Sequence, residues 1–166
     1  QMIAEVYGVL REGEGRSPAE ISKLFGTWDT GPLQSYLAEI THKVLAATDP
    51  ETGKPMVDII MDKAGQKGTG RWTLIEALKL GQSASTIEAA VGARSWSAAK
   101  DLRIFGDVTL TPATLSTTPD VTDADLEGAL LAARVIAYAQ GFSLLAAASD
   151  EFDWALDLAR TARMLR

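Results

Sequence analysis

The segment from Leu126 to Ala148 constrains the fold more than any other part of this sequence. It is rich in alanine and leucine and apolar on most faces of a helix, and Thr122 with Asp125 precedes it as a capping pair. Because Arg134 and Gln140 lie inside the segment, we expect a helix packed in protein and no membrane span. A helix that is apolar all round is normally central in its domain or shared with a partner subunit.

The other apolar residues also recur with helical periodicity. The pattern predicts helices at residues 2–12, 18–28, 33–44, 56–63, 73–80, 85–104 and 152–166. In the helix at 33–44, the apolar stripe is Leu33, Tyr36, Leu37, Ile40 and Val44. Residues 49–55 form a polar loop, residues 106–121 form the longest break, and no segment alternates as a strand would. The predicted fold class is therefore all-α, a multi-helical bundle.

Three helix starts show a hydroxyl residue followed three positions later by glutamate, which is the spacing of a capping box. The pairs are Ser17 with Glu20, Thr73 with Glu76, and Ser85 with Glu88. Pro18 at the first helical position strengthens the first of them.

Composition excludes several classes of function. The 166 residues suffice for one domain, and the net charge of -6 argues against broad nucleic-acid binding. The absence of cysteine excludes disulfides and thiolate metal sites and fits the cytoplasm. His42 is the only histidine, so a Ser-His-Asp triad or a histidine-rich metal site has little to work with. No signal peptide is visible, and both ends look cut within helical patterns.

The segment Gly65–Gly70 carries the clearest chemistry. Glycine allows positive φ and close approach of a ligand, and successive N–H groups in such a turn can bind an anion. Lys67 adds a cation and Thr69 a hydroxyl, so the segment suits a phosphorylated ligand. It is not a Walker loop, since Gly68 separates Lys67 from Thr69. A plain loop between helices, with a solvated lysine, is the alternative.

The longer string from Ile60 to Trp72 resembles the signature of the 6-phosphogluconate dehydrogenase family. In that signature an aliphatic residue, an aspartate two positions later, Gln-Lys-Gly-Thr-Gly and a tryptophan recur, and every position is filled here. Three further stretches resemble the family in the same order, at residues 28–41, 93–101 and 136–142. The first departs from the family pattern at Asp29, where asparagine is usual.

The resemblance implies an activity and an organisation. The family's enzymes use NADP to oxidise and decarboxylate 6-phosphogluconate to ribulose 5-phosphate in the pentose phosphate pathway. They combine a Rossmann domain, a large all-α domain with tandem helical repeats, and a C-terminal tail. Residues 1–166 are then a single all-α substrate-binding and dimerisation domain, without the Rossmann domain or the tail. We expect the first repeat at about 1–105, a linker at 106–121 and the start of the second repeat at 122–166. The sequence similarity between residues 3–8 and 136–141 fits these repeats.

The resemblance also implies roles for three residues. Lys67 and Thr69 match loop residues that hold the substrate, chiefly its phosphate, and Arg94 matches a helix arginine at the same phosphate. The family's catalytic lysine, asparagine and glutamate would precede Gln1, so no catalytic residue and no metal site is expected here. NADP would be bound mainly by the absent Rossmann domain. His42 matches no family site, so we expect it to be structural or exposed. The chain alone should be inactive, and the enzyme should be a cytoplasmic homodimer without nucleic-acid or membrane partners.

A second interpretation assigns the chain to another class of protein. The chain could be a stand-alone all-α oligomerisation module without a catalytic role. Arg94 would then be a surface ion-pair partner, and the four tryptophans, Trp28, Trp72, Trp96 and Trp154, would be core or interface residues in either case. A Rossmann sequence upstream in the reading frame would favour the enzyme, and its absence would favour the module.

Overall fold

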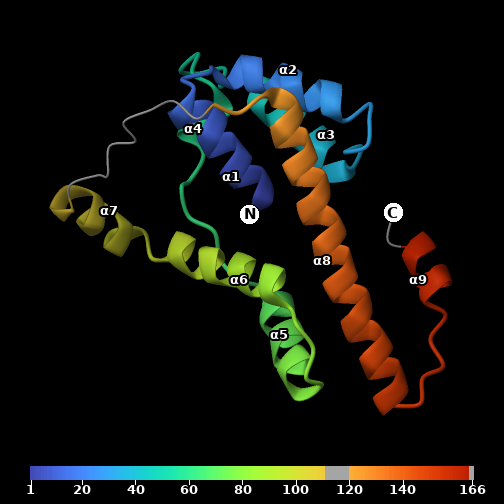
Figure 1. Cartoon of the computed structure of the whole chain (residues 1–166). Helices are drawn as coiled ribbons and strands as arrows, with labels where there is room; N and C mark the ends of the chain where they lie inside the picture. The colour runs from blue at the N-terminus through green and yellow to red at the C-terminus, as the bar shows by residue number, and fades with distance from the viewer. Residues whose placement is uncertain (111–119, 165–166) are drawn as a thin grey trace. The chain divides into compact units, whose positions relative to one another are not determined.

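The computed structural model describes residues 1–110 and 120–164, which form helices joined by loops (Figure 1). Their order is α1 (Met2–Gly8), η1 (Val9–Gly13, a π-helix), α2 (Pro18–Trp28), α3 (Tyr36–Ala46), α4 (Met56–Ile59), α5 (Thr69–Lys79), α6 (Ser85–Ala98), α7 (Lys100–Thr109), α8 (Asp123–Glu151) and α9 (Leu158–Met164). Within the described ranges no strand is present, and Thr48 and Pro55 form one isolated bridge across the polar loop. The predicted all-α class is confirmed.

Several predicted boundaries are wrong. The helix expected over 56–63 ends at Ile59, and residues 60–68 run as an extended loop. The helix expected over 85–104 is broken at Ala99, whose ψ of 54° lies outside the helical range, so α6 and α7 are separate. The C-terminal helix begins at Leu158, because positive φ at Asp153 and Ala155 breaks the chain after α8. The break predicted at 106–121 is wrong at its start, since residues 106–109 belong to α7, and residues 111–119 of it lie outside the described residues.

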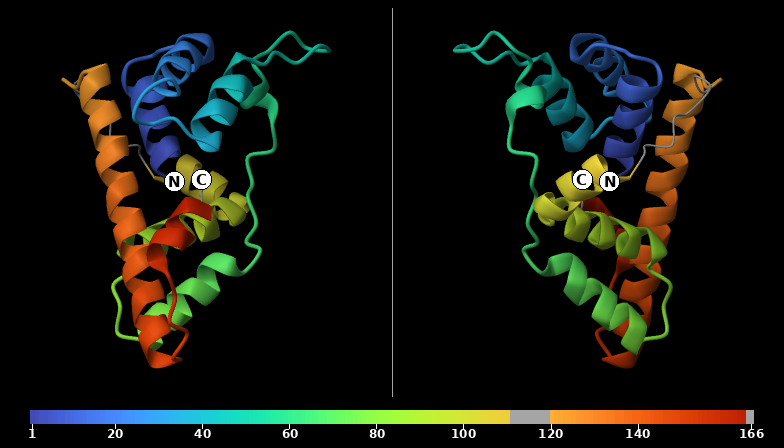
Figure 2. Two further views of the ribbon diagram at one scale, coloured as in Figure 1. Left: turned by 90° about the vertical axis from the view of Figure 1, so that its right-hand side faces the viewer. Right: turned by 90° about the vertical axis from the view of Figure 1, so that its left-hand side faces the viewer.

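The chain divides into two compact units, the first comprising residues 1–62 and 111–132. Helices α2 and α3 lie side by side in it (Figure 2). Its core is built around the fully buried side chains of Leu10, Ile21 and Phe25, and Phe25 packs edge-on against Trp28. The capping box at Ser17, with Pro18 as the first helical residue, is confirmed and starts the helix that supplies most of this core.

His42 joins α3 to α2 within this unit. Its Nδ1 donates to the carbonyl oxygen of Ser22 at 2.8 Å, and Ser22 Oγ donates to the His42 carbonyl oxygen at 2.9 Å. A Cβ atom at Gly26 would lie 3.0 Å from His42 Nδ1, so the two helices approach at a glycine. Of the two expectations for His42, structural or exposed, these contacts support the structural one.

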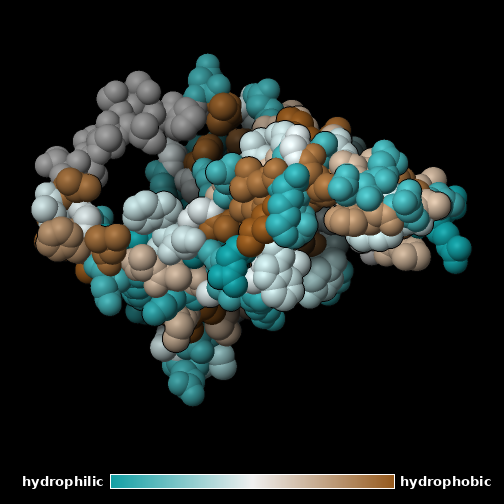
Figure 3. All heavy atoms as spheres, turned by 90° about the horizontal axis from the view of Figure 1, so that it is seen from below, coloured by the Kyte–Doolittle hydropathy of each residue, from teal (hydrophilic) through white to brown (hydrophobic). Residues whose placement is uncertain are grey.

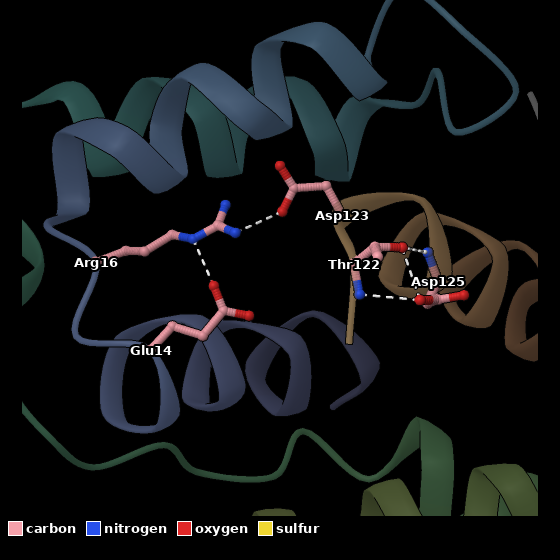
Figure 4. A network of polar contacts seen from close by, with 5 residues as sticks. All are labelled: Glu14, Arg16, Thr122, Asp123 and Asp125. Carbon is pink, nitrogen blue, oxygen red and sulfur yellow. Dashed lines mark hydrogen bonds and ion pairs between the residues drawn. The ribbon is translucent and has the colours of Figure 1, made fainter. Parts of the chain in front are cut away.

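The start of α8 is attached to the first unit by a polar network (Figure 4). Thr122 Oγ1 accepts from the backbone N–H of Asp125 at 3.1 Å, and the Asp125 carboxylate accepts from the backbone N–H of Thr122 at 2.9 Å, which confirms the predicted cap. Arg16 lies between Glu14 and Asp123, at N–O distances of 2.6 and 2.7 Å. Its hydrogen bond to Asp123 raises the pKa of Arg16, whose guanidinium is in any case always charged.

The second unit comprises residues 63–110 and 133–166. Ala77 of α5, Ala84 and Leu144 of α8 form its buried core. The predicted capping box at Ser85 is wrong, because a distant residue takes its place: Gln140 of α8 accepts from the Thr86 backbone N–H at 3.0 Å and donates to Ser85 Oγ at 2.9 Å. Gln140 therefore completes the first turn of α6, where Ala84 offers no side-chain cap.

Helix α8 is long and apolar enough to cross a membrane by length and composition alone, with a mean hydropathy of 1.5 in its most apolar window. Core helices of water-soluble proteins pass the same test. Gln140, in the middle of this helix, bonds to α6, so α8 packs against another helix of the chain. Much of its surface remains uncovered, since Val135, Ile136 and Tyr138 are each about half exposed or more.

Exposed apolar residues are common on other helices as well, and brown hydrophobic atoms interrupt the polar surface in the view from below (Figure 3). On the third helix, the apolar stripe found in the sequence is buried only at Leu33, which precedes α3. The helix turns Ala38 and Leu45 inward instead, which leaves Tyr36 and Leu37 largely exposed. Of the four tryptophans, Trp28 is buried in the core, whereas the other three are exposed.

Candidate functional site

The glycine-rich segment leads directly into α5. Gly68 has a φ of 99°, a left-handed conformation that L side chains rarely adopt, and it is the N-cap of the helix. Thr69 is the first helical residue, so the predicted cap at Thr73 is wrong; Thr73 lies inside the helix, where its hydroxyl donates to the Thr69 carbonyl oxygen at 2.9 Å. The first turn of α5 contains no acidic residue, so its unpaired N–H groups and the helix dipole favour an anion.

All three residues singled out from the sequence lie in the second unit and are exposed: Lys67, Thr69 and Arg94. Lys67 and Thr69 flank Gly68 at the start of α5. Arg94 comes from α6, and its Nε donates to the carbonyl oxygen of Gly65 at 2.8 Å. This contact brings the helix arginine to the same loop. Among the described residues, neither Lys67 nor Arg94 belongs to an ion pair with a carboxylate.

Further residues hold the loop against α6. Gln66 Nε2 lies 2.7 Å from Ser95 Oγ, and the backbone N–H of Ala64 donates to Ser97 Oγ at 3.1 Å. On the other side of the loop, a Cβ atom at Gly70 would lie only 2.8 Å from Val91 Cγ2. Sequence reasoning missed these contacts, and the only local signal is a pair of serines beside the arginine of α6.

Chemically, this arrangement is suited to binding and not to proton transfer. A lysine, an arginine, a hydroxyl and helix N–H groups together can surround a phosphate dianion. Within the described residues there is no group of three or more histidines and carboxylates that could hold a metal ion. The geometry therefore favours an anion site in which the loop and α6 contribute jointly.

Comparison with known proteins identifies the family. The family model for the 6-phosphogluconate dehydrogenase C-terminal domain matches residues 1–166. The chain belongs to this family. The expected all-α fold and the resemblance to the family are thereby confirmed.

Relatives agree along the whole length of the chain. The decarboxylating 6-phosphogluconate dehydrogenase of Schizosaccharomyces pombe is 44% identical over 168 residues, covering 100% of this chain and 34% of that protein. The NADP(+)-dependent, decarboxylating enzyme of Bacillus subtilis is 40% identical over 169 residues, covering 100% of this chain and 36% of that protein. The chain thus spans about a third of the length of these relatives.

A solved structure confirms the fold. Plasmodium falciparum 6-phosphogluconate dehydrogenase superposes with a TM-score of 0.91 at 36% identity, covering 98% of this chain and 36% of that chain. It is described in its apo form, with its cofactor NADP+ and with its substrate 6-phosphogluconate.

A second surface feature of this family domain lies on α8. Ala137, Tyr138, Gly141, Phe142 and Leu145 line an open apolar groove of about 300 Å³. The rings of Tyr138 and Phe142 are stacked with centroids 6.3 Å apart. The groove contains none of the loop residues and has no polar side chain other than the tyrosine, so it is not suited to a phosphate.

Proposed function

We propose that this chain is the substrate-binding and dimerisation domain of an NADP-dependent, decarboxylating 6-phosphogluconate dehydrogenase. The enzyme would convert 6-phosphogluconate to ribulose 5-phosphate, CO2 and NADPH. Family membership supports the activity. The contact between Arg94 and Gly65 supports the site, because it joins the loop and helix segments that the resemblance singles out.

Each of the three residues would have a separate role at the phosphate. Lys67 supplies an exposed cation on a flexible stem, and Thr69 supplies a hydroxyl and a helix N–H group. Arg94 uses Nε to hold Gly65, so its terminal Nη groups are the ones left for the ligand. Several charge-assisted hydrogen bonds would thus hold the substrate by its phosphate dianion.

NADP would be held by another part of the enzyme. The chain contains no Gly-x-Gly-x-x-Gly sequence, and among the described residues no sheet is present on which a dinucleotide fold could be built. The groups that accept and donate protons in the reaction would also come from outside this domain. The purified chain alone should therefore produce no NADPH from 6-phosphogluconate and NADP, and turnover above background would contradict this assignment.

Substitution of Lys67 in the full-length enzyme tests the site. Lys67→Ala should raise the KM for 6-phosphogluconate by about one to two powers of ten, because a hydrogen bond to a charged group contributes roughly 1.5–3 kcal/mol. Activity on unphosphorylated gluconate should hardly change. Lys79→Ala is the matched control, since Lys79 is an exposed lysine at the other end of α5. Equal losses on both substrates would mean that Lys67 supports the fold and does not bind phosphate.

We also propose that the enzyme is a cytoplasmic homodimer that associates through α8. The half-exposed apolar side chains of this helix and the groove beside Tyr138 support the proposal. Exposed apolar surface of this kind is characteristic of interfaces, and two-fold dimers are the commonest assemblies.

A further inference from the structure

The short segment Lys67–Thr69 is held at both ends by one turn of α6. On the N-terminal side, Gln66 Nε2 lies 2.7 Å from Ser95 Oγ and 3.4 Å from the Val91 carbonyl oxygen. On the C-terminal side, Gly70 lies against the side chain of Val91. Both attachments therefore converge on the turn Val91–Ser95.

These contacts are connected to one another. Ser95 Oγ donates to the Val91 carbonyl oxygen at 3.1 Å, so the hydroxyl that receives the Gln66 amide is itself fixed to the helix backbone. Arg94, the next residue of the same turn, holds Gly65 at 2.8 Å. Three consecutive residues of the loop, from Ala64 to Gln66, are thus each hydrogen-bonded to a side chain of α6.

We propose that Gln66 and Ser95 are positioning residues that set the place of Lys67 and Thr69 relative to Arg94. The proposal rests on the phosphate site proposed above. The Gln66 amide bonds to α6, and the next residue is the exposed Lys67. The Gln66–Ser95 bond therefore restricts the position of the Lys67 backbone, from which the side chain extends. A flexible loop would have to be ordered by the ligand, and that ordering would weaken binding. The bond lowers this cost by ordering the loop beforehand.

Variants in the full-length enzyme test the clasp, by which we mean the hydrogen bond between the Gln66 amide and Ser95 Oγ. Gln66→Met and Ser95→Ala should each raise the KM for 6-phosphogluconate about three- to tenfold, the range expected for one neutral hydrogen bond, with kcat changed less than twofold. The double variant should be no weaker in binding than the poorer single variant, because both changes remove the same bond. Ser95→Thr keeps the hydroxyl and should restore the KM of the parent enzyme. Ser83→Ala, at an exposed serine outside the helices, is the control.

The outcomes separate the clasp from the phosphate site. If Lys67→Ala raises KM while the Gln66 and Ser95 variants leave it unchanged, the clasp is wrong and the site stands. If the Gln66 and Ser95 variants weaken gluconate and 6-phosphogluconate equally and lower the melting temperature, the pair is merely structural and the clasp is again wrong. If Lys67→Ala itself has no effect on KM, the phosphate site is wrong and the clasp falls with it.

Discussion

Gly70 lies so close to Val91 that a Cβ atom at position 70 would be 2.8 Å from Val91 Cγ2. Valine is stiff at χ1 in a helix, so it cannot swing aside easily. Gly70→Ala should therefore destabilise the domain by about 1–3 kcal/mol, as overpacking does. Denaturant unfolding would measure the change.

Two further variants control for the effect of alanine itself. Gly92→Ala, in α6, places its new Cβ within 4 Å of nothing beyond its chain neighbours and the backbone of its own helix, and should be neutral or slightly stabilising. Adding Val91→Ala to Gly70→Ala should recover part of the loss, because it removes the clashing methyl group. Equal effects at Gly70 and Gly92 would mean that the close approach does not matter.

The cap of α8 should contribute to stability. Thr122→Ala removes the acceptor for the Asp125 N–H and should cost about 1 kcal/mol. Thr122→Ser keeps the oxygen and should behave like the parent chain. Thermal unfolding of the two variants would show the difference, and a Ser variant as unstable as the Ala variant would contradict the capping role.

The same cap predicts a dependence on pH. The hydrogen bond from the Thr122 hydroxyl lowers the pKa of Asp125, and the one from Ser17 lowers the pKa of Glu20. A carboxylate with a lowered folded-state pKa contributes stability that is fully present above its unfolded pKa, about 4. That contribution is lost as the pH falls through the lower folded value. The stability difference between the parent chain and Thr122→Ala should therefore shrink below about pH 4, in acid titrations followed by circular dichroism.

Arg16 should contribute more to the free energy of unfolding than an ordinary surface charge does. It bonds to Glu14 and Asp123, and Glu14 Oε1 is buried with no hydrogen-bond partner among the described residues. Arg16→Met would leave the Glu14 carboxylate without its cation and should cost about 1–3 kcal/mol. Glu14→Gln in the same chain should recover part of this loss. A cost below about 0.5 kcal/mol would place Arg16 among ordinary surface ion pairs.

The dimer proposal predicts a position-specific effect. Tyr138→Glu would put a charge into the apolar groove of α8 and should shift the protein toward monomer at micromolar concentration. Leu78→Glu, at an exposed leucine of α5, should leave the assembly unchanged. Sedimentation velocity would distinguish the species, and a parent chain that is monomeric throughout would contradict the proposal.

Local signals in the sequence predicted local structure well. The caps at Ser17 and Thr122 depend on atoms within three residues of each other, and both are present. The predictions at Thr73 and Ser85 failed where another interaction competed. Helix α5 begins at Thr69, before Thr73, because its N-cap is Gly68 in a left-handed conformation. At the start of α6, hydrogen bonds from Gln140 take the place of the cap expected at Ser85.

The candidate site was only partly predictable. Its ligand-type residues follow from the glycine-rich string and the family resemblance, and their role remains a prediction. The supporting contacts do not follow, because Gln66 and Ser95 are 29 residues apart and no periodic pattern links them. The exposed stripe of α3 was also unpredictable, because an apolar face has the same pattern whether it meets the core or a partner.

The bond from Gln140 to the start of α6 also bears on the order of folding. The helix that carries Arg94 and Ser95 is completed by a side chain 54 residues beyond Thr86. Closing a loop of that length has an entropic cost that must be met before the contact can form, so such contacts form late. During synthesis from the N-terminus, the glycine-rich loop is made long before Gln140, the residue that completes the first turn of α6. The phosphate site proposed at this loop would therefore be complete only once α8 has been synthesised and has packed against α6.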